Sequence, residues 1–455
     1  MSGNCARSPI VLPGLLALAA ATTVADTRPE TLVIAKDIGD IFTFAPSESF
    51  ELTAGEILAN AYDRIMTFEP EDPGTLTGGV AESHAVSDDG RTITLRIRDG
   101  LTFHSGYPVR PEDMEFSLEG ATRGSPTFIL TQFGWHADNV HELVEVVDEC
   151  HVRITIVEEF SPGLVLHALS AGVASVVDRE LAMAHQQDGD QGAVWLRTNS
   201  TGSGPFRLLS WQADESVVLE ANAGYRHGAP GVRRIVLRHA PNPATQRMLL
   251  ERGDVDIARD LMPGLIAALA GNEAIAIDSH PRGTLIYLAA NAAHPILGNR
   301  LVVHALRHAV DYHGMVESFL AGQFVVHQAF WPSGLWASHS ATPYRLDLAR
   351  ASELLAQAGQ RQGFAVRLET LTNPPFPAIA HAVAHTLAEI GIEAEVETME
   401  GTTLWPRYRS RRHQLILAPW SPDYVDPHTN ADGFARNPDN RPEANLTGVP
   451  AWRNT

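Results

Sequence analysis

The stretch Asp88–Leu118 constrains the fold more strongly than any other part of the chain. Between residues 93 and 97, isoleucine and leucine alternate with threonine and arginine, and this period of two predicts a half-buried strand. Asp-Gly pairs on both sides of the strand are typical turn signals. A second short strand is expected from residue 101 to 104. A helix with acidic residues in its first turn is expected from about Glu112.

The rest of the chain repeats this alternation of short strands and helices, which predicts an α/β protein. Its 455 residues are enough for two domains or lobes. A formal net charge of −20 argues against binding to nucleic acid or to an anionic membrane. The expected strands include 31–35, 152–157, 217–219, 235–237, 286–290, 364–368, 392–397 and 415–417, and the expected helices 53–66, 162–171, 243–252, 301–320, 348–358 and 377–390.

The N-terminal residues are typical of a secretory signal. Arg7 precedes an apolar run over 10–21, and small residues before and at Ala25 offer a cleavage site. The run is too short to span a bilayer. After cleavage, Cys150 is the single cysteine, so no internal disulfide is expected. These features predict a soluble protein in an exported compartment.

Several segments of the chain resemble the family-5 solute-binding proteins of ABC transporters, the periplasmic receptors for peptides, nickel and related ligands. The first is SDDGRTITLRIRDGLTFHSGYPVRPEDMEFSL at 87–118, and the second begins with GSGPFRLLSW at Gly202. The third is WSPDYVDPH at 420–428. The resemblance implies a bilobal periplasmic-binding-protein fold of type II, the large peptide-receptor type with an extra subdomain.

The resemblance also implies a division of the chain and an expectation about its end. Family members continue for many tens of residues beyond the Trp420 segment, so the chain is expected to be truncated and to lack the closing elements. The expected parts are a signal peptide at 1–25, lobe I at 26–59 and 180–278, an extra subdomain of lobe I at 60–179, and lobe II at 279–455.

The segment 420–428 carries the main site prediction. In peptide-binding members of the family, the aspartate at the place of Asp423 pairs with the ammonium group of the ligand. An ammonium group that leaves water needs a partner charge, so this role is physically sound. Trp420 and Tyr424 are expected either to line the pocket or to belong to the core. His428 is expected either to contact ligand, as in nickel-binding members, or to be an ordinary loop residue.

Two further segments give ligand-binding candidates by their position in the family. The loop after the first strand passes the ligand site in the family, and here it carries Ser47, Glu48 and Ser49. Trp331 lies in the segment 322–334, which resembles a second family loop. By residue type alone, the better interpretation of Ser47, Glu48 and Ser49 is a solvated loop.

The predicted function is the capture of a small peptide or similar amine-bearing solute and its delivery to an ABC permease. A nickel-chelate receptor is the alternative within the same fold. A metal-dependent hydrolase is the alternative from another class, because His304 and His308, like His381 and His385, are four residues apart on expected helices. No catalytic motif accompanies these pairs, so no enzyme activity, metal or cofactor is expected. A monomer is expected, with no nucleic-acid partner.

Overall fold

The computed structural model describes residues 30–69, 72–123, 128–157, 160–280 and 282–435. The expected signal peptide and the chain end beyond 435 lie outside these ranges. Within them, three sheets of four or five strands are joined by helices, which confirms the α/β class. In the described residues no helix has both the length and the apolar character that crossing a bilayer requires.

The first lobe is built on a five-stranded mixed sheet. Strand β1 lies inside it, parallel to both of its neighbours, and the other pairs are antiparallel. Helix α1 (Leu52–Ala61) buries Ile57 and Leu58 in the same core as Val217 and Leu219 of the sheet. The strands, in order across the sheet, are β11 (Ile257–Ala258), β1 (Thr31–Lys36), β10 (Arg234–His239), β9 (Ser216–Ala221) and β8 (Phe206–Gln212). The other helices of this part are α6 (Arg179–Ala184), α7 (Ala193–Leu196), α8 (Pro243–Arg252) and α9 (Pro263–Leu269).

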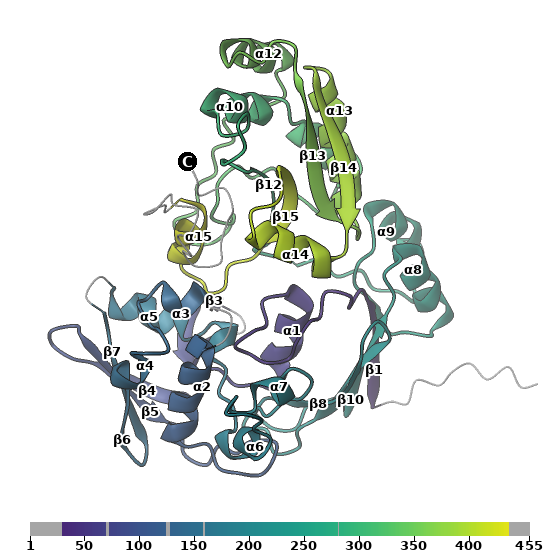
Figure 1. Ribbon diagram of the computed structural model, residues 1–455. Coiled ribbons are helices and arrows are strands. Elements are labelled where there is room, and N and C mark those ends of the chain that lie inside the picture. The colour runs from purple at the N-terminus through teal and green to yellow at the C-terminus, as the bar shows by residue number, and fades with distance from the viewer. Residues whose placement is uncertain (1–29, 70–71, 124–127, 158–159, 281, 436–455) are drawn as a thin grey trace, which may run out of the picture.

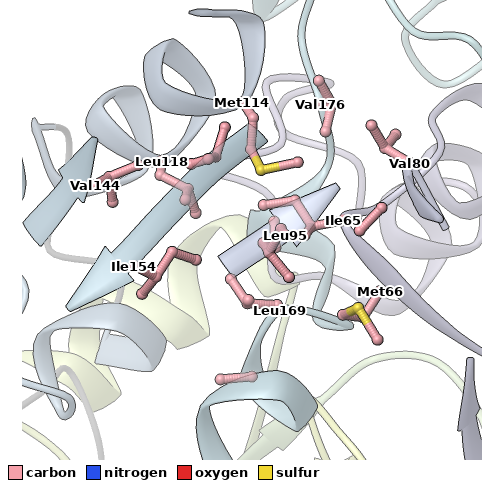
Figure 2. Close-up of a cluster of buried hydrophobic side chains, with 14 of the residues drawn as sticks. Ile65, Met66, Val80, Leu95, Met114, Leu118, Val144, Ile154, Leu169 and Val176 are labelled. Carbon is pink, nitrogen blue, oxygen red and sulfur yellow. The ribbon is translucent and has the colours of Figure 1, made fainter. Parts of the chain in front are cut away.

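A second sheet, of four antiparallel strands, belongs to the stretch that includes Asp88–Leu118. Strand β5 alternates partly buried and fully buried residues, as its sequence predicts. Figure 2 shows its Leu95 among the buried side chains, together with Met114 and Leu118 of helix α2. The strands, in order, are β4 (Ala81–Val86), β5 (Thr92–Ile97), β7 (His151–Thr155) and β6 (Val144–Asp148). The pair β2 (Met66–Glu69) and β3 (Asp72–Gly78) and the helices α2 (Pro111–Arg123), α3 (Phe128–Thr131), α4 (Val140–Leu143) and α5 (Pro162–Ala168) complete this subdomain.

The second lobe, green and yellow in Figure 1, has a four-stranded sheet covered on both faces. In β15, Leu415 and Leu417 face one core while Ile416 and Ala418 face the other. A strand buried on both sides needs an unbroken apolar run, and the letters LILA provide it. The strands, in order, are β12 (Leu285–Ala290), β15 (Leu415–Trp420), β13 (Phe364–Leu371) and β14 (Ile392–Met399). The helices are α10 (Arg300–His308), α11 (Tyr312–Glu317), α12 (Leu348–Gln357), α13 (Phe376–Ala388), α14 (Gly401–Arg409) and α15 (Pro427–Phe434).

Three local predictions were wrong. Residues 101–104 form no strand beyond one isolated bridge, because the chain turns back there and Phe103 N–H donates to Tyr107. Strand β5 pairs instead with β4 and β7. The helix expected over 301–320 is two helices, since Asp311 caps a new one by accepting a hydrogen bond from Gly314 N–H. The helix expected to reach Met66 ends at Ala61.

Each of the three larger sheets draws on its own part of the described chain. The five-stranded sheet draws on residues 31–36 and 206–258, the subdomain sheet on 81–155, and the last sheet on 285–420. The buried clusters follow the same division, except that Tyr424 of the second lobe joins the core of the subdomain. The expected division into lobe I, its extra subdomain and lobe II, with limits at 60, 180 and 279, stays a prediction.

His413 makes the stability of the second lobe dependent on pH. Its side chain is 2% exposed, and neither ring nitrogen has a hydrogen-bond partner within the described residues. Burial, assisted by the positive charge of Arg407, lowers the pKa of His413 from 6.5 to about 4. Between these two values the unfolded chain binds more protons than the folded chain. The free energy of unfolding therefore decreases as the pH falls through this window.

We predict that His413→Gln removes this dependence. Relative to the variant, the wild type should lose about 3 kcal/mol of unfolding free energy between pH 7.5 and pH 4. Denaturant unfolding at several pH values measures the difference. His141→Gln, which changes an exposed histidine, is the control and should track the wild type. Parallel pH profiles for the wild type and His413→Gln would contradict the prediction.

Candidate ligand-binding site

The segment 420–428 connects the end of a central strand to a short helix. Trp420 is the last residue of β15 and lies opposite Leu285 of β12. The chain then leaves the sheet, and the hydroxyl groups of Ser421 and Thr284 lie 2.8 Å apart. Asp426 caps α15 by accepting a hydrogen bond from His428 N–H at 2.9 Å, and Pro427 occupies the first helical position. The sequence therefore folds this segment by strand pairing on one side and helix capping on the other.

Asp423 is held by the helix that follows it. Its Oδ2 accepts a hydrogen bond of 3.2 Å from the hydroxyl of Thr429, a buried residue in the first turn of α15. Asp426, and not Asp423, caps α15. Thr429 therefore positions the Asp423 side chain, and the Asp423 carboxyl group does not cap the helix.

The carboxyl group of Asp423 lacks a cationic partner. No ion pair joins it to any lysine, arginine or histidine in the described part of the chain. Burial raises the pKa of Asp423 to about 7, and the hydrogen bond from Thr429 lowers it only in part. A partly buried carboxylate of this kind is stabilised by a cation brought from outside. An ammonium group meets that requirement.

Tyr424 and His428 lie at the contact between the second lobe and the subdomain of the first lobe. The hydroxyl of Tyr424 accepts a hydrogen bond of 3.0 Å from Gln132 Nε2 and lies 2.9 Å from His428 Nδ1. The His428 ring stacks on Phe133, with centroids 5.5 Å apart. Figure 1 shows α15 next to α3 and α5 at this place. Of the two expectations for Tyr424, the structure places it in the core, where it is 2% exposed.

Trp420 and Trp331 are both fixed by hydrogen bonds from their indole nitrogens. Trp420 Nε1 donates to Asn430 Oδ1 at 2.8 Å, and Trp331 Nε1 donates to the Trp336 carbonyl at 2.7 Å. The buried amide of Asn430 also donates to the Phe330 carbonyl. The segments around 331 and 420 are therefore tied together, although they are far apart in sequence.

The loop candidates of the first lobe differ from one another in their environment. Glu48 forms a two-point ion pair with Arg197, at 2.8 and 3.0 Å, within the same lobe. Ser47 is partly buried. The hydroxyl of Ser49 is buried and has no hydrogen-bond partner among the described residues. Of the three, Ser49 retains a free polar group that a ligand could use, whereas Glu48 is already paired.

A contact between the lobes was not predicted from the sequence. The two residues that position Asp423 and Trp420 were not predicted either. Glu51, at the start of α1, lies 3.8 Å from Arg409 of α14. The Glu51 side chain is 7% exposed, and burial raises its pKa. Thr429 and Asn430 are the positioning residues. The Asp-Pro pair at 426–427 could have indicated Thr429 and Asn430, because this pair is typical of a helix start and places both residues in the first turn.

The metal alternatives find little support in this arrangement. Among the described residues, only Asp148, Cys150 and His151 form a group of three side chains able to hold a metal ion. The pairs His304–His308 and His381–His385 lack a third ligand there. His428 is likewise outside any such group.

Comparison with known sequences places the chain among transport receptors. The sequence model "Bacterial extracellular solute-binding proteins, family 5 Middle" matches residues 75–441. A probable D,D-dipeptide-binding periplasmic protein, DdpA, of Escherichia coli (strain K12) is 27% identical, over 93% of this chain and 81% of its own length. A dipeptide-binding protein of the same organism is 24% identical, over 90% of this chain and 80% of its own length.

Solved structures agree on the fold. DppA of Helicobacter pylori, in complex with the peptide STSA, has a TM-score of 0.79 at 23% identity and covers 88% of this chain and 80% of its own. NikZ of Campylobacter jejuni, in complex with Ni(L-His), has a TM-score of 0.74 at 21% identity and covers 93% of this chain and 83% of its own. The chain therefore has the bilobal periplasmic-binding-protein fold of the family-5 type, as its sequence predicted.

We predict that Asp423→Asn stabilises the ligand-free protein at high pH. The pKa of Asp423 is raised from 3.8 to about 7, so the folded state binds more protons in this window and loses stability as the pH rises through it. Asparagine keeps the shape and removes this cost. In denaturant unfolding, the free energy of unfolding of the variant should exceed that of the wild type by up to about 4 kcal/mol at pH 8 and by only about 1 kcal/mol at pH 4.5.

Asp426→Asn serves as the matched control. It makes the same chemical change three residues away, and asparagine caps helices as well as aspartate does. Its effect should be small at both pH values. An Asp423→Asn variant that is less stable than the wild type at pH 8 would contradict the burial argument.

Proposed function

The chain belongs to family 5 of the bacterial extracellular solute-binding proteins, and on this basis we propose that it captures a small peptide with a free amino terminus. Asp423 is the observation that supports this ligand class. Its carboxyl group is partly buried, has no cationic partner in the described residues, and has a pKa raised to about 7. The ligand ammonium would supply the missing positive charge.

Ligand capture by closure of two lobes is consistent with the contacts around the site. Gln132 and Phe133 of the subdomain meet Tyr424 and His428 directly after Asp423 in the chain. A ligand bound to Asp423 therefore lies next to the surface where the lobes touch. Its ammonium group would stabilise the closed arrangement by neutralising a charge that closure removes from water.

Ser49 is a second candidate contact. Its hydroxyl is buried and has no partner in the described part of the chain, and it lies on the first-lobe loop that ends at Glu51. A peptide amide or carboxylate could accept its hydrogen bond. Glu48 is the weaker candidate, because Arg197 already neutralises it.

Transport follows from the family rather than from the site geometry. Family members act as the binding component of ABC importers, so the partner of this chain would be the membrane subunits of a permease. The place of action would be the periplasm, in accordance with the secretory features of residues 1–25. The nickel-chelate alternative has less support, because Nδ1 of His428 is engaged by Tyr424.

Titration calorimetry tests the peptide proposal. The probes are L,L- and D,D-dialanine and glutathione, since relatives are named as binders of dipeptides, D,D-dipeptides and glutathione. For a probe that binds the wild type, Asp423→Asn should weaken binding by about 2–5 kcal/mol, or roughly 30- to several-thousand-fold. At pH 7, binding to the wild type should also release about half a proton from Asp423.

Controls separate the charge effect from a loss of structure. The N-acetylated form of the same peptide has no ammonium group and should bind the wild type and Asp423→Asn equally weakly. Asp426→Asn should bind the free peptide as the wild type does. Should Asp423→Asn bind the free-amine peptide within about threefold of wild type, Asp423 is not the anchor.

A further inference from the structure

A cluster of three metal-ligating side chains lies far along the chain from Asp423, at the turn between β6 and β7. Asp148 ends β6, His151 begins β7, and Cys150 lies in the two-residue turn between them. Cys150 Sγ lies 3.3 Å from His151 Nδ1 and 3.4 Å from Asp148 Oδ1. His151 Nδ1 lies 2.9 Å from the same carboxylate oxygen. The three different ligand atoms therefore lie within 3.4 Å of one another.

We propose that Asp148, Cys150 and His151 form a binding site for a divalent transition-metal ion of the zinc type. A sulfur, a nitrogen and an oxygen ligand form one face of a tetrahedron, and a water molecule would complete it. For zinc bond lengths of about 2.0–2.3 Å, the edges of that face measure about 3.3–3.6 Å. The distances from Cys150 Sγ, 3.3 Å to His151 Nδ1 and 3.4 Å to Asp148 Oδ1, nearly match these edges. The distance of 2.9 Å between His151 Nδ1 and Asp148 Oδ1 must increase by about 0.4 Å.

The backbone fixes the three residues in this arrangement. Asp148 and His151 are paired across the ladder of β6 and β7. Cys150 N–H donates to Asp148 Oδ1 at 2.9 Å, and the Cys150 carbonyl accepts from Ile97 N–H of β5 at 2.8 Å. The turn is therefore anchored to two strands. A metal ion would bind without a change in the hairpin backbone.

The surroundings favour a cation. Arg96, whose positive charge acts on the Cys150 thiol, is paired with both Asp99 and Glu82. Arg153 of the same strand as His151 is paired with Glu145. No ion pair with arginine or lysine ties up Asp148 in the described residues. The site is also partly exposed, so an ion can reach it from solution.

The ligand set selects the type of metal. Thiolate and imidazole prefer zinc and related transition metals, whereas magnesium and calcium require oxygen ligands in larger number. The ion would join the ends of β6, the edge strand, and β7. It would stabilise the hairpin and take no part in binding at Asp423. Zinc should therefore raise the melting temperature without changing peptide affinity.

Metal titration of the full chain tests the proposal. Zn²⁺ is titrated in competition with a chromophoric chelator, and Co²⁺ reports a thiolate ligand by its charge-transfer absorption in the near ultraviolet. One Zn²⁺ per chain is expected. Cys150→Ser and His151→Ala should each weaken binding by at least about 10–100-fold, the range seen when even an outer-shell partner is removed. Excess Mg²⁺ should not compete.

Matched variants identify the ligands. Cys5→Ser removes the other cysteine and His141→Ala removes an exposed histidine of α4, and both should bind Zn²⁺ as the wild type does. Asp148→Asn keeps the acceptor for Cys150 N–H and should still weaken binding. The proposal is overturned if Cys150→Ser binds Zn²⁺ within about threefold of the wild type. It also fails if the Co²⁺ form has no thiolate absorption, or if His304→Ala alone abolishes binding.

Discussion

The insertion of Tyr424 into the first lobe is the interaction on which the arrangement of the candidate site depends. Its ring is buried in the core of the subdomain, and its hydroxyl group bonds to Gln132 of that subdomain and to His428 of its own lobe. Asp423 immediately precedes it, so the same insertion carries a carboxyl group to the contact between the lobes. An aromatic ring with one polar end suits this place, because it combines apolar burial with a specific hydrogen bond.

In the proposed site, Asp423 works against the stability of its own protein. A carboxylate without a partner charge is costly to bury, and the raised pKa of Asp423 is a measure of that cost. The protein would recover the cost when a ligand brings an ammonium group. Glu48 and Glu369 differ from Asp423 because their negative charges are neutralised within the protein, by Arg197 and by Arg407. A carboxylate that already has an arginine partner attracts a cationic ligand only weakly.

The two proposed sites differ in what holds them. The site at Asp423 is assembled from a strand end, a helix start and a distant subdomain, so its geometry depends on how the lobes meet. The cluster at Asp148, Cys150 and His151 is local and depends on one hairpin turn. A change in lobe arrangement would alter the first and leave the second intact. Independent measurements of peptide and zinc binding can therefore separate them.

Local pattern determined many of the elements of this protein. The alternation in β5 and the unbroken apolar run of β15 each have one stable environment, a half-buried strand and a doubly buried strand. Asp347 caps the helix expected from residue 348, because its side chain needs only a backbone N–H three residues away. The resemblance of segment 420–428 to known receptors pointed to Asp423.

Only the tertiary structure decided how these parts meet. Sequence could not show that residues 101–104 turn back without pairing, since strand partners are chosen by distant segments, here β4 and β7. It left Tyr424 open between pocket wall and core, because burial depends on a subdomain almost 300 residues earlier in the chain. It could not show that Arg197 neutralises Glu48 while Asp423 stays unpaired in the described residues. The sequence by itself determined which residues can carry a charge and where they lie along the chain. The three-dimensional fold determined which of these charges have partners, because the energy of a charge depends on what lies within a few ångströms of it.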